Sequence, residues 1–226
     1  PSPLPHVGEG GGGRGADGEG GLDAWLLSKL HILVRDVTTA LDTYDVPGAT
    51  RPIQEFVDDL SRWYLRRSRR RFWKSEADAD KQSAYTTLYE ALVTLAKLLA
   101  PTMPFLAEEL YQNLVVSVNP QAPESVHLAD WPTFHASRIN ERLNSDMTVV
   151  MKLASLGHAA RKQSNLKVRQ PLAEAMFSTA KADEGRAVAA YADLLSDELN
   201  VKSVRALGAA GEVISYSLNP LVKQLG

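Results

Sequence analysis

Apolar residues recur at helical spacing along most of this chain. From residue 22 onward they repeat every three or four positions, which is the period of one face of an α-helix. The spacing predicts amphipathic helices over residues 22–44, 50–73, 81–100, 105–116 and 138–164. Long amphipathic helices joined by short breaks pack as antiparallel neighbours. The pattern therefore predicts a mainly α-helical protein whose residues 22–165 form an antiparallel bundle.

Polar residues and prolines mark the ends of these helices. Asp23 is a candidate N-cap for the first helix, since a short acidic side chain can accept a hydrogen bond from the first turn. The sequence Asp-Val-Pro-Gly at 45–48 predicts a break, so we expect the second helix to start near Thr50. Pro52 then falls in the first turn, where its missing N–H costs nothing. Three prolines within residues 117–136 predict a loop there.

The two ends of the chain differ from the bundle. Nine of the 15 glycines lie in residues 1–21, a composition typical of a disordered leader. Short extended pieces at 167–172 and 174–178, a helix at 185–199, and strands at 201–207 and 213–218 are expected further on. Residues 166–226 are therefore predicted to form a small α+β unit, and we expect this unit to be truncated at its C-terminus.

Composition removes several classes of function. The chain has 226 residues, a net charge of −2 and no cysteine, so disulfides, thiolate zinc sites and cysteine catalysis are excluded. No apolar run is long enough to span a membrane. The five histidines have no metal-ligand spacing, and no nucleophile motif occurs, so we expect neither a metal site nor catalytic residues. The charge balance excludes a generally basic protein but allows a local basic patch.

Such a patch occurs at residues 62–74, which carry six arginines, one lysine and no acidic residue. Guanidinium groups bind phosphates bidentately and stack on bases, and interleaved aromatic residues could stack on unpaired RNA bases. The candidate RNA-binding residues are Arg62, Arg66, Arg67, Arg69, Arg70, Arg71, Trp73 and Lys74. A weaker basic cluster, either an auxiliary RNA contact or solvated charge, comprises Arg161, Lys162, Lys167 and Arg169.

Other interpretations of the arginines stay open. Cations at a helix C-terminus oppose the helix macrodipole, and the aromatic residues could belong to the core. The apolar stripe of the second helix runs into Arg67 and Arg71, which could instead turn inward. Acidic partners for them would then be residues such as Asp58, Glu108 or Glu109. A helical interaction module that docks an acidic protein through these arginines is the alternative function, and a non-functional translated fragment is a third hypothesis.

Four stretches, in the same order, resemble one known family. They are residues 56–73, with Arg-Arg-Ser-Arg-Arg-Arg-Phe-Trp at their end, and residues 84–90, 98–111 and 167–172. Together they resemble the anticodon-binding region of isoleucyl-tRNA synthetases, which are class I aminoacyl-tRNA synthetases. The similarity runs from about residue 22 to residue 226.

This resemblance implies recognition of a tRNA anticodon arm, with isoleucine tRNA as the expected partner. The family's ATP signatures, His-x-Gly-His and Lys-Met-Ser-Lys-Ser, do not occur in this chain. We therefore expect a cytoplasmic fragment that lacks the catalytic and editing domains, holds no cofactor and is inactive alone. ATP and Mg²⁺ would belong to the catalytic domain of the same synthetase, which is the second expected partner. Neither DNA nor a membrane is expected as a partner.

Overall fold

The computed structural model describes residues 20–73, 78–179 and 181–207. Contacts gather the chain into two compact units that divide between Asn144 and Ser145, and each unit is described by itself. The glycine-rich residues 1–19, Lys74 and the strand expected at 213–218 lie outside the described residues.

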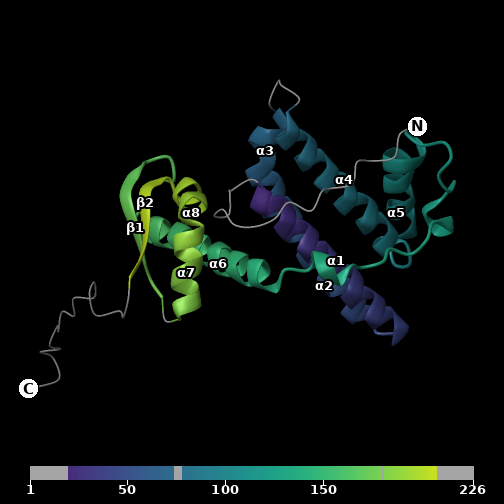
Figure 1. Cartoon of the computed structure of the whole chain (residues 1–226), viewed down its shortest axis with the longest axis horizontal. Coiled ribbons are helices and arrows are strands. Elements are labelled where there is room, and N and C mark those ends of the chain that lie inside the picture. Colours follow the sequence, from purple (N-terminus) through teal and green to yellow (C-terminus); the bar gives the residue numbers. More distant parts are fainter. Residues whose placement is uncertain (1–19, 74–77, 180, 208–226) are drawn as a thin grey trace, which may run out of the picture. The chain divides into compact units, whose positions relative to one another are not determined.

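The first unit is helical (Figure 1). Its elements are α1 (Gly20–Asp42), α2 (Val46–Asp59), the π-helical segment η1 (Leu60–Leu65), α3 (Arg66–Trp73), α4 (Ala79–Leu99), α5 (Pro104–Tyr111) and the π-helical segment η2 (Gln112–Val116). Helix α1 packs against α2 and α4, and α4 packs in turn against α3 and α5. The buried apolar side chains of α1 lie on one stripe: Leu22, Trp25, Leu26, Leu30, Leu33, Val34 and Val37.

Helix α2 begins earlier than the sequence indicates. Asp45 caps it, because its carboxylate accepts a hydrogen bond from the backbone N–H of Gly48 at 2.9 Å. Pro47 therefore occupies the first turn, and Pro52 lies inside the helix. The expected start near Thr50 is wrong because the break before the helix is itself an N-cap, a role in which Asp is strongly favoured. Pro52, the seventh of the 14 residues of α2, removes one intrahelical N–H donor.

The loop at 117–136 is fixed to the helices at several points. Val126 is buried against Ala107 and Tyr111 of α5. The indole N–H of Trp131 donates a hydrogen bond to Thr38 Oγ1 at 2.9 Å. Short 3₁₀ turns lie within this region and just after it, at Val126–Leu128 (η3) and Ala136–Arg138 (η4). The segment is thus an ordered part of the first unit.

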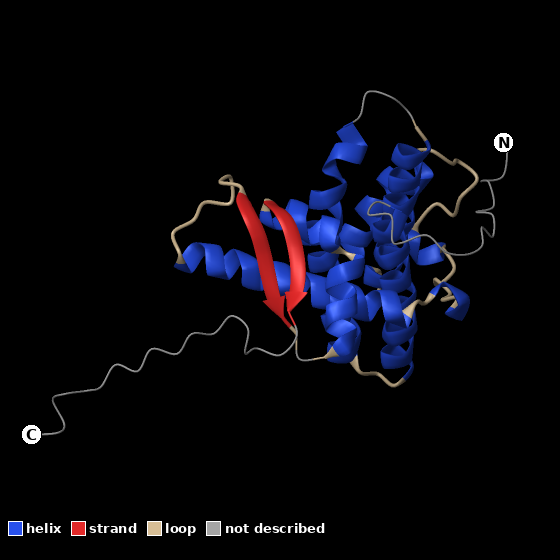
Figure 2. Ribbon diagram, turned by 60° about the vertical axis from the view of Figure 1, so that its left-hand side comes forward, coloured by secondary structure: helices blue, strands red, loops and turns tan. Residues whose placement is uncertain are grey.

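The second unit combines most of α6 (Glu141–Gln163) with β1 (Leu172–Ser178), α7 (Ala182–Ala190), α8 (Ala192–Leu199) and β2 (Val201–Leu207). The two strands run parallel (Figure 2). Helices α7 and α8 connect them, as parallel strands require, and both helices pack on β2. The helix expected at 185–199 is divided in two at Tyr191. Nevertheless, a mainly helical chain with a small α+β unit is confirmed.

The division between the units lies at the start of α6, whereas the sequence suggested a boundary after residue 165. Two contacts explain this difference. His158 Nε2 lies 3.0 Å from the carboxylate of Glu198 in α8, and the backbone at Gly157 closely approaches the side chain of Leu199. Helix α6 therefore packs with the elements that follow it.

Candidate nucleic-acid interface

The arginine-rich stretch is built on η1 and α3. In a π-helix the backbone N–H bonds to the carbonyl five residues earlier, so each turn holds more residues than in an α-helix. Both Trp63 and Tyr64 are buried on this wide turn. Single π-helical turns occur frequently at functional sites. The wide turn thus anchors the stretch in the core by two neighbouring aromatic rings.

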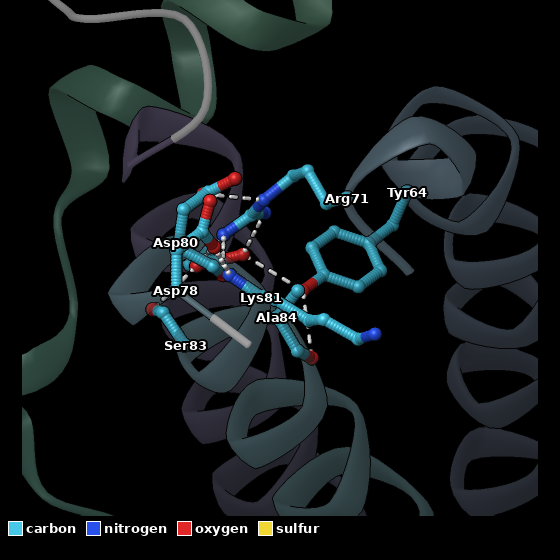
Figure 3. A network of polar contacts seen from close by, with 8 residues as sticks. Tyr64, Arg71, Asp78, Asp80, Lys81, Ser83 and Ala84 are labelled. Atoms are coloured by element: carbon cyan, nitrogen blue, oxygen red, sulfur yellow. Dashed lines mark hydrogen bonds and ion pairs between the residues drawn. The ribbon is translucent and has the colours of Figure 1, made fainter. Parts of the chain in front are cut away.

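Arg71 is the second anchor, and it is 1% exposed. Its Nη1 and Nη2 donate to the two carboxylate oxygens of Asp23, each at 2.7 Å, and its Nε donates to Asp80 Oδ1 at 2.7 Å. Asp23 also accepts hydrogen bonds from the hydroxyls of Tyr64 and Ser83, both at 2.7 Å. This network, the Asp23–Arg71 network, joins α1, η1, α3 and α4 (Figure 3).

The charges in the network reinforce one another. Burial raises the pKa of the Tyr64 hydroxyl, and its hydrogen bond to Asp23 raises that pKa further. Burial alone would lower the pKa of Arg71, but its hydrogen bonds to Asp23 and the charges of Asp23 and Asp80 outweigh burial and raise it. Hydrogen bonds to the charged form favour that form. Arg71 is therefore a permanent buried cation that is matched by two carboxylates.

This geometry corrects two expectations. Arg71 was expected to contact RNA, but its guanidinium is enclosed by Asp23 and Asp80, so it holds α3 in place instead. Arg71 does turn inward, but its acidic partners are not Asp58, Glu108 or Glu109. Asp23 is not an N-cap, because α1 already begins at Gly20. One sequence signal could have identified Asp23: it lies beside the apolar stripe of α1, where an acidic residue needs a buried partner.

The rest of the stretch is mostly exposed. The exposed side chains are those of Arg62, Arg66, Arg69, Arg70 and Trp73. Arg69 lies over the ring of Trp73, with 5.4 Å between Cζ and the ring centroid, which is a cation–π contact. Arg67 is half-buried and lies over the ring of Trp63 at 5.9 Å. We call the segment Arg62–Trp73, without its buried members, the arginine surface.

Arg62 of the arginine surface has an acidic partner that binds it only weakly. Arg62 Nε lies 3.3 Å from Asp58 Oδ1, one helical turn away, and both side chains are well exposed. Exposed ion pairs at this spacing are worth only about 0.3–0.5 kcal/mol. A phosphate group can replace such a partner at small cost.

The second basic cluster divides in the same way. Arg161 is buried, and its guanidinium donates to the backbone carbonyls of Lys167, Gln170 and Asn200 at 3.0–3.1 Å. It therefore secures the turn after α6, and the expected RNA contact through Arg161 is not compatible with this structure. Lys162, Lys167 and Arg169 are exposed, and their contact with RNA stays a prediction.

Two further observations concern the part of the chain that the structure describes. None of its His, Asp and Glu side chains form a group of three that could hold a metal ion. None of its helices combines the length and apolar character needed to cross a membrane.

Comparison with known proteins identifies the class first. Residues 23–176 match the family model of the anticodon-binding domain of tRNA ligases, and the chain belongs to that family. The match includes the Asp23–Arg71 network and the whole arginine surface.

Three individual relatives are ligases for one amino acid, isoleucine. The isoleucine–tRNA ligase of Dehalococcoides mccartyi is 54% identical over 193 residues, which cover 85% of this chain and 19% of that protein. The isoleucine–tRNA ligase of Thermus thermophilus is 47% identical over 206 residues, 91% of this chain and 20% of that protein. The isoleucine–tRNA ligase of Clostridium acetobutylicum is 42% identical over 205 residues, which cover 91% of this chain and 19% of that protein. The resemblance to the anticodon-binding region of isoleucyl-tRNA synthetases is confirmed, and the chain spans about a fifth of these relatives' length.

Proposed function

We propose that this chain recognises the anticodon arm of isoleucine tRNA as part of an isoleucine–tRNA ligase, the enzyme that attaches isoleucine to tRNA with ATP. The observation that carries the proposal is the arginine surface, which lies within the matched family region and is exposed on a helix held by a buried ion-pair network. Guanidinium groups on such a rigid support can bind backbone phosphates bidentately.

The chemical role of this chain is positioning. Phosphate contacts fix the orientation of a nucleic acid without reading its sequence. A tRNA held by its anticodon arm brings its acceptor end to a distant active site, and fixed orientation lowers the entropic barrier to the reaction there. The activation of isoleucine, with its ATP and Mg²⁺, belongs to the catalytic domain of the parent ligase, which is the second proposed partner. A cytoplasmic location is part of this proposal.

Salt-dependent RNA binding tests the proposal. The triple variant Arg66→Ala/Arg69→Ala/Arg70→Ala removes three exposed cations of the arginine surface. Each lost phosphate contact should reduce the slope of log K against log salt by about one, so we expect weaker tRNA binding and a slope smaller by about three. The matched control Arg51→Ala/Lys152→Ala/Lys202→Ala removes three exposed cations elsewhere and should retain most of the affinity and slope.

The two other hypotheses give different results. Unchanged tRNA affinity and salt slope in the Arg66/Arg69/Arg70 variant would refute the proposal and favour an acidic protein as the partner of these arginines. A non-functional fragment would give no cooperative unfolding transition. A further variant, Lys162→Ala/Lys167→Ala/Arg169→Ala, tests the auxiliary cluster in the same assay.

A further inference from the structure

Exposed aromatic rings occur at the end of α3 and on α4. Trp73 is 77% exposed, and Tyr85 and Tyr89 of α4 are 49% and 42% exposed. Phe72 links the two helices, since its ring meets that of Tyr85 edge to face, with 5.1 Å between the centroids. Tyr85 and Tyr89 are one helical turn apart and so share one face of α4. We call Trp73, Tyr85 and Tyr89 the aromatic strip.

Tyr85 and Tyr89 lie outside the buried face of α4. The core side of α4 consists of other residues, mainly small and aliphatic: Ala84, Thr87, Ala91, Leu95, Ala96 and Leu98. Single exposed apolar residues are common on protein surfaces, but neighbouring exposed aromatic rings mark interaction sites. Tyrosine and tryptophan suit such sites because they offer large, rigid faces together with a polar atom.

The charges around the aromatic strip favour an anionic partner. Arg69 lies over the ring of Trp73, so the strip begins within the arginine surface. The acidic side chains of α4, Asp80 and Glu90, are both paired with arginines of the same chain. Asp80 binds Arg71, and Glu90 binds Arg138 with 2.6 Å between Oε1 and Nη1. Neither carboxylate is therefore left to repel phosphates along this face.

Flat aromatic faces beside guanidinium groups are the combination that binds single-stranded nucleic acid. The bases of a duplex are stacked on each other and cannot use an external aromatic face, whereas the unstacked bases of an RNA loop can. We infer that the aromatic strip is a stacking platform for unpaired bases of an RNA loop. This inference rests on the proposed function and adds residues of α4 that the sequence did not single out.

The test uses the full chain and two RNA probes: an anticodon stem-loop of isoleucine tRNA, and a loop-free RNA duplex of the same length. The variant Tyr85→Leu/Tyr89→Leu keeps apolar side chains but removes the flat faces. We expect it to bind the stem-loop about fivefold or more weakly, since that factor is the lower end of what one stacked base contributes. Its affinity for the duplex and its salt slope should not change.

Two matched variants separate stacking from general effects. Tyr85→Phe/Tyr89→Phe keeps the rings and should bind the stem-loop normally. Phe105→Leu removes a ring that is 90% exposed on α5, away from the strip in the sequence, and should also bind normally. Equal losses for stem-loop and duplex in the leucine variant would overturn the inference, because they would indicate a change in the fold rather than in stacking.

The outcomes also distinguish the inference from the proposed function. Normal stem-loop binding by the leucine variant, together with weak binding by the Arg66/Arg69/Arg70 variant, would overturn the inference alone. If neither variant changes RNA binding, the proposed function fails as well. If the variant Tyr85→Leu/Tyr89→Leu does not fold, the unaltered protein can be tested with a stem-loop that carries the fluorescent base 2-aminopurine in its loop. Stacking quenches its emission, and unchanged emission on binding would overturn the inference.

Discussion

The Asp23–Arg71 network gives the sharpest prediction about stability. Asp23→Ala removes the acceptor of four hydrogen bonds of 2.7 Å: two from Arg71, one from Tyr64 and one from Ser83. Breaking a buried ion pair by deleting one partner typically costs about 3–5 kcal/mol. Asp80 still holds Arg71 Nε, so the charge stays partly paired. We therefore expect a loss of about 3 kcal/mol in the free energy of unfolding.

Urea unfolding followed by tryptophan fluorescence measures this loss. The four tryptophans, Trp25, Trp63, Trp73 and Trp131, all precede the division at residue 144, so their emission reports on the first unit alone. With an m-value of about 1–3 kcal/mol/M, the urea midpoint should fall by at least about 1 M. The control Asp36→Ala removes a half-exposed carboxylate of the same helix, which pairs with its neighbour Arg35, and should cost under about 0.5 kcal/mol.

A double-mutant cycle tests whether the network acts as a unit. Arg71→Met alone leaves the Asp23 carboxylate buried beside two hydroxyls, and Asp23→Leu alone leaves the Arg71 guanidinium with Asp80 as its acidic partner. The pair Asp23→Leu/Arg71→Met removes both of these charges. Replacing a buried ion pair by apolar residues of similar size is often nearly neutral. The double variant should therefore be clearly more stable than the sum of the single losses predicts, by about 2 kcal/mol or more. Additive losses, or a loss below about 1 kcal/mol for Asp23→Ala, would refute the argument.

Two further predictions concern a histidine and a glycine. Burial, and then the nearby Arg138, lower the pKa of His31 below its ordinary value. The unfolded chain therefore binds this proton more readily, and stability should fall as the pH drops below about 6.5. Fluorescence-monitored urea unfolding of His31→Gln should show a flatter pH dependence. In Gly157→Ala, the new Cβ would lie 2.6–2.7 Å from the methyls of Leu199. Overpacking costs about 1–3 kcal/mol of stability, whereas replacing a helical glycine by alanine gains about 1 kcal/mol. Thermal unfolding followed by circular dichroism should therefore show a net loss of stability. Gly21→Ala, with no atom near its Cβ, should be neutral or stabilising.

The sequence predicts most helices because their apolar stripes follow a local period. The same argument locates the arginine stretch at a helix end and predicts that Arg71 lies on the core-facing stripe. It cannot identify the partner, since Asp23 is 48 residues away and no spacing links the two. The start of α2 was misplaced because a proline and a glycine after an aspartate resemble a break as much as a capped first turn.

Basic clusters in a sequence do not separate supporting arginines from exposed ones. Arg71 is enclosed by two aspartates, and Arg161 by three backbone carbonyls, so most of their five N–H donors are used inside the protein. Lys162 and Arg169 look the same in the sequence but are exposed. What distinguishes the two groups is the set of acceptors that the fold brings to each guanidinium, and each set includes one from a distant segment: Asp23 lies 48 residues from Arg71, and Asn200 lies 39 residues from Arg161.

The two kinds of arginine depend on each other at α3. Helix α3 is the last part of a continuous helical run, Val46–Trp73, and its closely spaced exposed cations repel one another. Arg71 offsets this by bringing in the carboxylates of Asp23 and Asp80, which tie the helix to α1 and α4. Phosphate contacts require guanidinium groups in fixed positions. The buried arginine thus allows its exposed neighbours to stand close together on a rigid helix, which links the stability of this unit to its proposed grip on RNA.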